Sequence, residues 1–338
     1  MKILKKRPDR EFTVLNLTDT QLSDEEWADG HRNRNILEYT VKELVRRVQP
    51  DLITISGDLA WAGHYHAYEM LAELLESFEI PWAPVWGNHD NQGGAEAVDR
   101  VAGKYLTYPH CLYEKGDPLY GNGNYVIVIE EQGVPVEAFL MIDSHDRTPY
   151  VDENGEEQEA WARLTDPQLA WIGEQLDALA ANGCGDATLI MHIPIYAYRN
   201  ASKAAYKAGI EPRSITFQMA DGEDVWNDGY TDSVGVQYEG IGSYVHDEGA
   251  LEVFKRSGIA RRMLCGHDHV NNWKIRYDGM HLMYALNTGA GCYWVPFMNG
   301  GTVLKIDGRG VYDVEDVFID VQHLLEGEDL YPQPPVSD

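Results

Sequence analysis

The chain has 338 residues, of which 44% are hydrophobic, and its formal net charge is −28 at pH 7. This length suits one large α/β domain or two smaller ones, and the negative charge disfavours a nucleic-acid or anionic membrane partner. The four cysteines form no close pair, so neither a disulfide framework nor a thiolate zinc site is expected. No apolar stretch reaches the roughly 20 residues of a membrane span. We therefore expect a cytoplasmic protein.

The first third of the chain alternates between predicted strands and helices. Short apolar runs of β type cover residues 12–18, 52–56 and 81–86, and stretches with helical spacing cover residues 34–48 and 66–78. A βαβαβ beginning of this kind predicts a parallel sheet with right-handed crossovers.

The same periodicities predict the later elements. In chain order these are a helix at 95–105, strands at 124–130 and 137–142, an acidic loop at 152–159, a helix at 166–181, a strand at 187–191, a helix at 249–257, and strands at 261–265, 273–277, 280–286, 302–306 and 311–318. Residues 196–246 are irregular and rich in Gly, Asp, Tyr and Trp, which predicts a lid-like insertion or a loop that packs on itself. We expect one domain over residues 1–325 and a mobile acidic tail over 326–338.

Five polar segments stand where predicted strands end. They are Asp19-Thr20-Gln21, Gly57-Asp58, Gly87-Asn88-His89-Asp90, His192 and Gly266-His267-Asp268-His269. In open α/β sheets, ligands bind beyond the carboxyl ends of the strands, so these segments are expected to converge. Their carboxylates, imidazoles and amide oxygens are groups that bind divalent metals. Five such segments together predict a site for two metal ions.

The order of these segments resembles the calcineurin-like metallophosphoesterase superfamily. The motifs of that superfamily are D-x-H, G-D, G-N-H-[DE], a lone His and G-H-x-H, and the resemblance covers most of the chain, about residues 12–318. The stretch from Tyr238-Glu239-Gly240-Ile241 to Gly266-His267-Asp268-His269-Val270-Asn271 is similar to single-domain, purple-acid-phosphatase-like members. The resemblance implies an α/β fold, namely a four-layer αββα sandwich of two mixed β-sheets flanked by helices.

The resemblance also implies a role for each polar residue of the motifs. Asp58 would bridge two divalent ions. The other ligands would be Asp19, Gln21 and His269 at the first ion, and Asn88, His192 and His267 at the second. His89 would bind the phosphate or donate a proton to the leaving group. Asp268 would have an outer role at most, because alternate side chains at a strand end point in opposite directions.

Two positions depart from the pattern of the family. Gln21 stands where the D-x-H motif has histidine; its neutral oxygen favours manganese or iron over zinc at the first ion. The alternative is that Gln21 is a surface amide and that water fills the coordination position. Trp61 stands where true purple acid phosphatases carry their iron-binding tyrosine, so no purple colour is expected. The protein-phosphatase arginines are also missing at 59–61 and 91–93, which disfavours a phosphoprotein substrate.

Contacts to the substrate are less well marked in the sequence. Arg199 follows His192 closely, and His145 ends another predicted strand, so both are candidates for contacting the phosphate or lining its pocket. The alternative for each is structural: a solvated surface charge for Arg199 and a packed ring for His145. Further candidates considered on the same grounds are Lys203, Lys207 and Arg213 on the irregular stretch, and His64 and His66 near the cleft.

The predicted chemistry is hydrolysis of a phosphate ester by a hydroxide that bridges two ions of manganese, iron or zinc. Two divalent ions bring four positive charges, and Asp19, Asp58 and the hydroxide return three, which leaves about one to attract a phosphate. A small phosphorylated monoester is the favoured substrate, because a compact dianion suits that charge.

A phosphodiesterase and a non-catalytic or weakly active metal- or phospholigand-binding protein remain alternatives. A nuclease is disfavoured by the absence of a basic stripe. The oligomeric state stays open.

Overall fold

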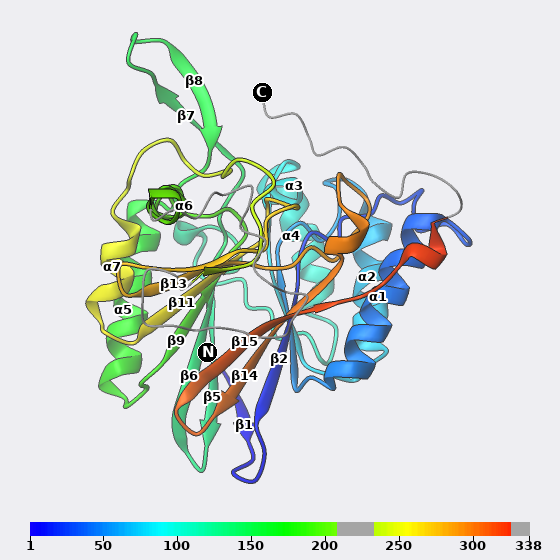
Figure 1. Ribbon diagram of the computed structural model, residues 1–338, viewed down its shortest axis with the longest axis horizontal. Coiled ribbons are helices and arrows are strands. Elements are labelled where there is room, and N and C mark those ends of the chain that lie inside the picture. The colour runs from blue at the N-terminus through cyan, green and yellow to red at the C-terminus, as the bar shows by residue number, and fades with distance from the viewer. Residues whose placement is uncertain (208–232, 326–338) are drawn as a thin grey trace.

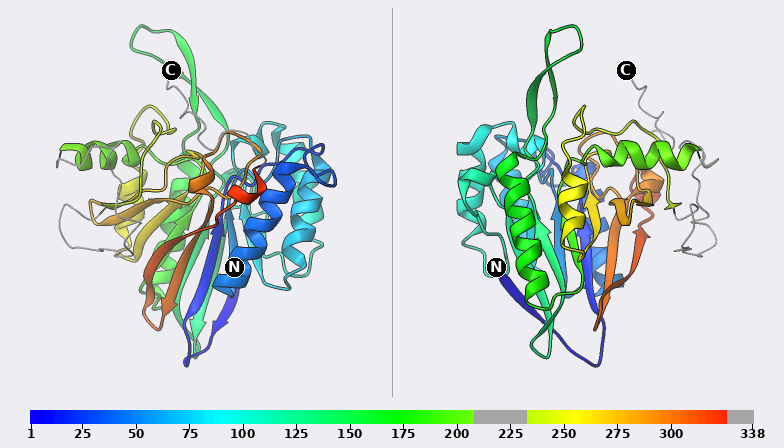
Figure 2. Two further views of the ribbon diagram at one scale, coloured as in Figure 1. Left: turned by 45° about the vertical axis from the view of Figure 1, so that its right-hand side comes forward. Right: turned by 90° about the vertical axis from the view of Figure 1, so that its left-hand side faces the viewer.

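The computed structural model describes residues 1–207 and 233–325. Two β-sheets lie face to face, and helices cover the outer face of each, as Figure 1 and Figure 2 show from three directions. The predicted four-layer αββα sandwich of two mixed sheets is therefore confirmed. The expected tail at 326–338 and the middle of the expected lid-like insertion, 208–232, lie outside the described residues.

The smaller sheet has five strands in the order β15-β14-β2-β3-β4. Strands β2 (Phe12–Leu17), β3 (Leu52–Ser56) and β4 (Trp82–Val85) are parallel, as the βαβαβ pattern predicted. Strands β14 (Gly300–Asp307) and β15 (Gly310–Phe318) extend the sheet in antiparallel fashion beyond β2. The carboxyl ends of the three parallel strands therefore meet at one edge of this sheet.

The larger sheet has eight strands in the order β1-β5-β6-β9-β11-β13-β12-β10. They are β1 (Lys2–Lys6), β5 (Tyr125–Glu131), β6 (Val134–Met141), β9 (Ala187–Ile190), β11 (Ala260–Cys265), β13 (Met280–Tyr284), β12 (Lys274–Tyr277) and β10 (Ser233–Val234). The central strands β6, β9, β11 and β13 run parallel to one another. Their carboxyl ends deliver the segments that follow β9 and β11 to a common edge.

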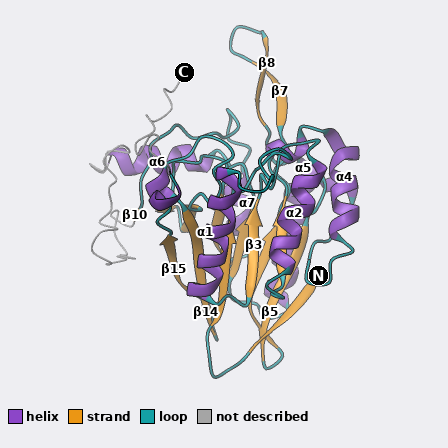
Figure 3. Ribbon diagram, turned by 90° about the vertical axis from the view of Figure 1, so that its right-hand side faces the viewer, coloured by secondary structure: helices purple, strands orange, loops and turns teal. Residues whose placement is uncertain are grey.

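Helices close both outer faces. The five-stranded sheet carries α1 (Arg32–Val48), and beyond it α2 (Tyr65–Glu76) and α4 (Gly94–Tyr105), which Figure 3 displays face on. The eight-stranded sheet carries α5 (Asp166–Ala181), α6 (Ala197–Lys207) and α7 (Ala250–Arg256). None of the helices in 1–207 and 233–325 is both long and apolar enough to cross a membrane.

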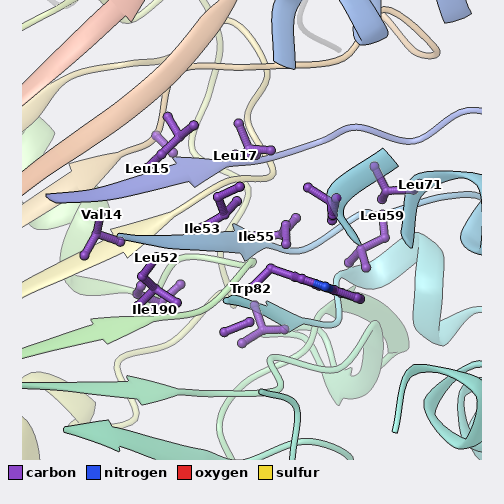
Figure 4. Packing of buried hydrophobic residues seen from close by; sticks show 14 of the residues in the cluster. Val14, Leu15, Leu17, Leu52, Ile53, Ile55, Leu59, Leu71, Trp82 and Ile190 are labelled. Carbon is purple, nitrogen blue, oxygen red and sulfur yellow. The ribbon is translucent and has the colours of Figure 1, made fainter. Parts of the chain in front are cut away.

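Alternation along the strands builds two hydrophobic layers. On β5, Ile127 and Ile129 join the core between the sheets, whereas Val126 and Val128 face the opposite way, into the core beneath α5. Val14 and Leu52 of the smaller sheet point toward Ile190 of the larger sheet, whereas Leu15 and Ile53 point the opposite way, toward the helices, as Figure 4 shows from close by. Each fully buried aliphatic side chain of this kind contributes roughly 1.5–3 kcal/mol, so these two layers fix how the strands are stacked.

A buried charge network joins the two sheets at one edge. Lys274 of β12 lies 2.7 Å from Asp316 of β15, and both side chains are only 2% exposed. Thr302 of β14 donates to the second oxygen of Asp316, and Asn272 donates to the first. Because removing one partner of a buried pair leaves an uncompensated charge, this network specifies how the sheets meet.

The helix predicted at 166–181 has the predicted bounds. Thr165 is its N-cap: the Thr165 hydroxyl accepts a hydrogen bond from the backbone N–H of Gln168, and the side-chain oxygen of Gln168 accepts one from the backbone N–H of Thr165. Most other predicted elements shift by only a few residues at their ends, as fraying termini lead one to expect.

Three local predictions were wrong. Strand β1 was not foreseen, because its lysines give an edge strand little hydrophobic signal. The acidic loop predicted at 152–159 is a mostly exposed turn only over 152–156; residues 157–159 belong to β8 (Glu157–Trp161), which forms a hairpin with β7 (Arg147–Val151). The stretch predicted to be irregular begins with helix α6, most of whose buried positions are the small residues Ala197, Ala201, Ser202 and Ala205.

Candidate metal centre

All five predicted segments converge where β2, β3, β4, β9 and β11 end. His269 Nε2 lies 3.3 Å from an oxygen of Asp19, and His192 Nε2 lies 3.2 Å from an oxygen of Asp58. One ligand atom each from Asp19, Asp58 and His269 can be chosen so that all lie within 4.8 Å of one another. The predicted first set is therefore clustered around a point that a cation could occupy.

The predicted second set is equally compact. The side-chain oxygen of Asn88 lies 2.8 Å from His267 Nδ1 and 3.1 Å from His192 Nε2. His192 thus lies between Asn88 and the shared Asp58. These atoms come from positions up to 179 residues apart, yet all of them are buried. The geometry suits two adjacent cations that share Asp58, and the ligand roles themselves remain predictions.

Gln21 provides the clearest sign that a group is held here. Its side chain is fully buried, so the surface-amide alternative is wrong. Neither its oxygen nor its nitrogen has a hydrogen-bond partner among the described residues. Leaving a buried polar group unpaired costs about 1–3 kcal/mol, whereas an amide oxygen can bind a cation directly. The residues present therefore fit a metal site.

Strained backbone turns the ligand side chains into the centre. Asp19, Asp58 and His267 have φ values of 53°, 50° and 78°, in the left-handed region that residues other than glycine rarely adopt. Each such residue costs of order 1–3 kcal/mol, and such residues cluster at functional sites. The backbone N–H groups of Asp19 and Gln21 donate to the carbonyls of Gly57 and Asp58, which fixes the two strand ends side by side.

Two glycines permit the close approach of the segments. A Cβ on Gly87 would lie 2.1 Å from an Asp58 oxygen, and one on Gly266 would lie 2.0 Å from the Thr18 hydroxyl oxygen. Both contacts are far shorter than van der Waals distance. Any side chain at these positions would push Asp58 or the β2 segment away from the other ligands.

Asp90, a residue to which the sequence analysis gave no role, ties two of the loops together. Its carboxylate accepts hydrogen bonds from the backbone of Gly87 and Leu59 and from the hydroxyl of Tyr68. The loop that carries Asp58 and the loop that carries Asn88 are therefore held by one buried side chain. The signal in the sequence was the acid at the fourth position of the Gly87 segment.

Hydrogen bonds also fix the orientation of two histidine rings. His192 Nδ1 lies 2.9 Å from the carbonyl oxygen of Ser56, and His269 Nδ1 lies 2.8 Å from that of Tyr293. A carbonyl can only accept, so each Nδ1 carries the proton. Nε2 of each ring therefore faces the centre, as in metal sites whose histidines are oriented by outer partners.

The buried charges shift one another strongly. Burial lowers the pKa of His192, but Asp58 outweighs it and raises that pKa to about 9. Burial also lowers the pKa of His269, but the charge of Asp19 outweighs burial and raises that pKa to about 8. Burial, followed by the charge of His192, lowers the pKa of His267 to about 3. Without metal, two of the three histidines are therefore protonated at neutral pH.

His89 stands beside the centre and is partly accessible. Its Nε2 lies 4.0 Å from Asp58, its backbone N–H donates to Asp58, and 22% of its side chain is exposed. Nδ1 lies 3.0 Å from the side-chain oxygen of Gln92, and the ring packs on Trp61 with centroids 4.3 Å apart. A donor role for Nδ1 toward Gln92 would leave Nε2 facing the place where a substrate would bind.

Two further aromatic rings border the ligands, and the sequence analysis gave neither a role. Trp161 of β8 meets His267 edge to face, with centroids 4.3 Å apart and planes at 86°. Tyr293 stacks on His269 at 4.3 Å, and its hydroxyl donates to Glu239. Nothing in the local sequence of either residue indicated this placement, since both come from segments that only the tertiary fold brings to the centre.

The candidate substrate residues face protein groups. Arg199 donates to the hydroxyl and the carbonyl of Ser243, so it joins α6 to a neighbouring loop. His145 lies 2.8 Å from the side-chain oxygen of Gln168 through Nε2 and 3.6 Å from Asp143 through Nδ1. Both observations favour the structural alternatives, and no contact of either residue with the metal ligands supports the substrate role.

Asp268 also points away from the ligands. Its carboxylate accepts hydrogen bonds from the backbone of Gly242 and from the hydroxyl of Tyr284. This placement agrees with the expected outer role. Asp268 anchors the segment that carries His267 and His269 to the backbone of Gly242.

Comparison with known proteins identifies the family. The family described as calcineurin-like phosphoesterase matches residues 12–271, which is more than half of the chain. The chain belongs to this family. A dimetal phosphatase from Danio rerio has the same fold, with a TM-score of 0.54, 15% identity, and coverage of 91% of this chain and 98% of that one.

Curated relatives are distant and longer. Phosphatase DCR2 of Saccharomyces cerevisiae is 22% identical over 325 residues, which are 90% of this chain and 52% of the relative. Probable inactive purple acid phosphatase 28 of Arabidopsis thaliana is 24% identical over 282 residues, which are 76% of this chain and 62% of the relative. The chain thus spans between half and two thirds of the length of these relatives, so their activities are not transferred to it directly.

Metal affinity should rise with pH. Below the pKa values of about 8 for His269 and about 9 for His192, a cation must displace a proton from each ring before it can bind. We expect up to two protons released from these rings per loaded centre near pH 6.5, and none from them above about pH 10. Calorimetry of manganese binding in buffers of different ionisation enthalpy measures this number. An affinity that does not change between pH 6.5 and pH 10 would contradict the assignment of both rings as ligands.

Proposed function

We propose that this chain hydrolyses phosphate esters with the help of two divalent metal ions. The observation that carries the proposal is the convergence of seven potential ligands around Asp58, together with the buried, unpaired side chain of Gln21. Membership of the calcineurin-like phosphoesterase family supports the same reaction class. When bound, the ions would supply the charge that activates a water molecule and stabilises the attacked phosphate.

Each residue of the centre has a distinct task in this proposal. Asp58 would be shared by both ions. The remaining ligands would be Asp19, Gln21 and His269 for one ion, and Asn88, His192 and His267 for the other. Burial of all seven excludes bulk water, which strengthens their hold on the cations. A single carboxylate belongs to one ion alone, so the protein leaves the pair with excess positive charge for an anionic substrate.

His89 is the proposed proton donor to the leaving group. Its Nε2 lies close to Asp58, while Gln92 and Trp61 fix the ring from the other side. Partial exposure lets the ring reach a bound ester and exchange protons with solvent. A histidine can donate a proton near neutral pH.

Replacing His89 tests this role. We expect His89→Ala to lower kcat by about 10²–10⁴-fold and to leave the bound metal unchanged, because His89 is not a ligand. Turnover of p-nitrophenyl phosphate and metal analysis by mass spectrometry measure the two effects. His323→Ala is the control, since that ring packs on Tyr39 in the α1 region. Unchanged turnover in His89→Ala would contradict the proton-donor role.

A phosphate monoester is the proposed substrate class, and a small molecule the proposed partner. The strongly negative chain and the compact, buried centre favour a small dianion over a long polyanion. We expect kcat/KM for p-nitrophenyl phosphate to exceed that for bis(p-nitrophenyl) phosphate by at least about tenfold, which corresponds to roughly 1.4 kcal/mol. The reverse order would establish the diesterase alternative.

We also propose that the protein is located in the cytoplasm.

The metal preference is proposed to be manganese or iron at the Gln21 position. An amide oxygen is a harder ligand than imidazole, and hard ligands suit these metals better than zinc. We expect Gln21→His to tighten zinc binding at the first position by about tenfold or more, as measured by calorimetry. Gln322→His, at an exposed position, is the matched control. Equal, tight binding of zinc at both positions of the unaltered protein would contradict this preference.

A weakly active or non-catalytic protein that binds metal or a phosphorylated ligand is the second candidate. The observation in its favour is that an Arabidopsis thaliana relative is named a probable inactive purple acid phosphatase. The observation against it is that His89 stands beside a full set of ligands. Absence of turnover in fully metal-loaded protein would favour this second candidate.

A further inference from the structure

The base of the β7–β8 hairpin touches the metal centre. Arg147, the first residue of β7, pairs in register with Trp161, the last residue of β8. The guanidinium carbon of Arg147 lies 3.8 Å from the centroid of the Trp161 ring, and the same ring meets His267 edge to face at 4.3 Å. One aromatic ring thus separates a positive charge from a predicted metal ligand.

The topology accounts for this placement. The hairpin follows β6, which runs parallel to β9, and β9 delivers His192. The hairpin therefore leaves the sandwich at the same edge as the metal ligands and projects beyond it, as Figure 1 and both views of Figure 2 show.

The charge of Arg147 is available for a ligand. The side chain is exposed and stacks on Trp161. Burial raises the pKa of the neighbouring Asp146, and the charge of Arg147 opposes this rise.

Trp161 gives the arginine a fixed position. A guanidinium stacked on tryptophan gains roughly 0.5–2 kcal/mol, depending on its exposure to water. The ring itself contacts His267, so the stacked guanidinium is held one ring away from a predicted ligand before a substrate arrives. A solvated surface arginine would lack this support, as Arg309 does with 89% of its side chain exposed.

We propose that Arg147 is a substrate contact whose guanidinium binds non-bridging oxygens of the phosphate group at the metal centre, with Trp161 holding it in position. This inference rests on the proposed function. The planar fork of arginine matches two phosphate oxygens at once, which lysine cannot do. Arg147 thereby takes the role that the sequence analysis had considered for Arg199.

The outer part of the hairpin restricts which substrates reach this arginine. It carries five acidic residues: Asp152, Glu153, Glu156, Glu157 and Glu159. A substrate with further negative charges on its leaving group would be repelled by them, whereas a compact phosphate ester with a neutral or cationic leaving group would not. The hairpin therefore disfavours substrates whose leaving group carries further negative charges.

Binding of inorganic phosphate to manganese-loaded protein tests the role of Arg147 without turnover. We expect Arg147→Ala to raise the Kd of phosphate by about tenfold to a hundredfold, the loss typical of hydrogen bonds to a charged group. Arg147→Lys should recover only part of this loss, because it lacks the fork. Arg163→Ala is the matched control: Arg163 follows the hairpin closely, and its partner Asp166 is exposed. We expect no change there.

Metal analysis of the same samples separates the two proposals. Full metal content with an unchanged phosphate Kd in Arg147→Ala would overturn the role of Arg147 and leave the proposed function intact. Failure of the unaltered protein to take up metal would overturn the proposed function and this inference together. Trp161→Leu provides a second variant: normal metal content with a weakened phosphate Kd supports the stacking, and wild-type affinity contradicts it.

Discussion

The shared carboxylate of Asp58 is the group on which the rest of the site depends. It is only 1% exposed, and burial of a lone carboxylate would raise its pKa, yet contact with His192 and His89 lowers it. His192 at 3.2 Å and the backbone N–H of His89 reach Asp58 from different strands. Keeping this charge buried requires both sheets to be packed as they are, so the sandwich and the centre are mutually dependent.

The glycines and left-handed residues of the loops follow from the same requirement. A buried carboxylate can be approached from several sides only if the surrounding backbone comes within van der Waals contact, which Gly87 permits. The strain at Asp19 and His267 is tolerated because paired strands fix both neighbours. Bound cations would relieve part of the cost of clustering these polar groups, so metal and fold are expected to stabilise each other.

The sequence was most informative where polar motif residues stand at the ends of predicted strands. The fold class, the parallel strands β2, β3 and β4, and the clustering of the ligands could all be predicted, because strand polarity determines where their ends meet. Contacts between segments that share no sequence pattern could not be predicted. Trp161 and Tyr293 reach the ligands through tertiary packing alone, and Arg199 is captured by Ser243, a partner 44 residues away.

The span of the chain over which the centre is assembled also affects how the protein is made. The backbone of His267 donates to Asp19 across a separation of 248 residues. A nascent polypeptide on the ribosome can form β2, β3 and β4 early, but it lacks His267 and His269 until synthesis is well advanced. The complete set of ligands is therefore assembled late in synthesis, and fragments that end before β11 would have Asp58 beside His192 but would leave Asp19 without its partner His269.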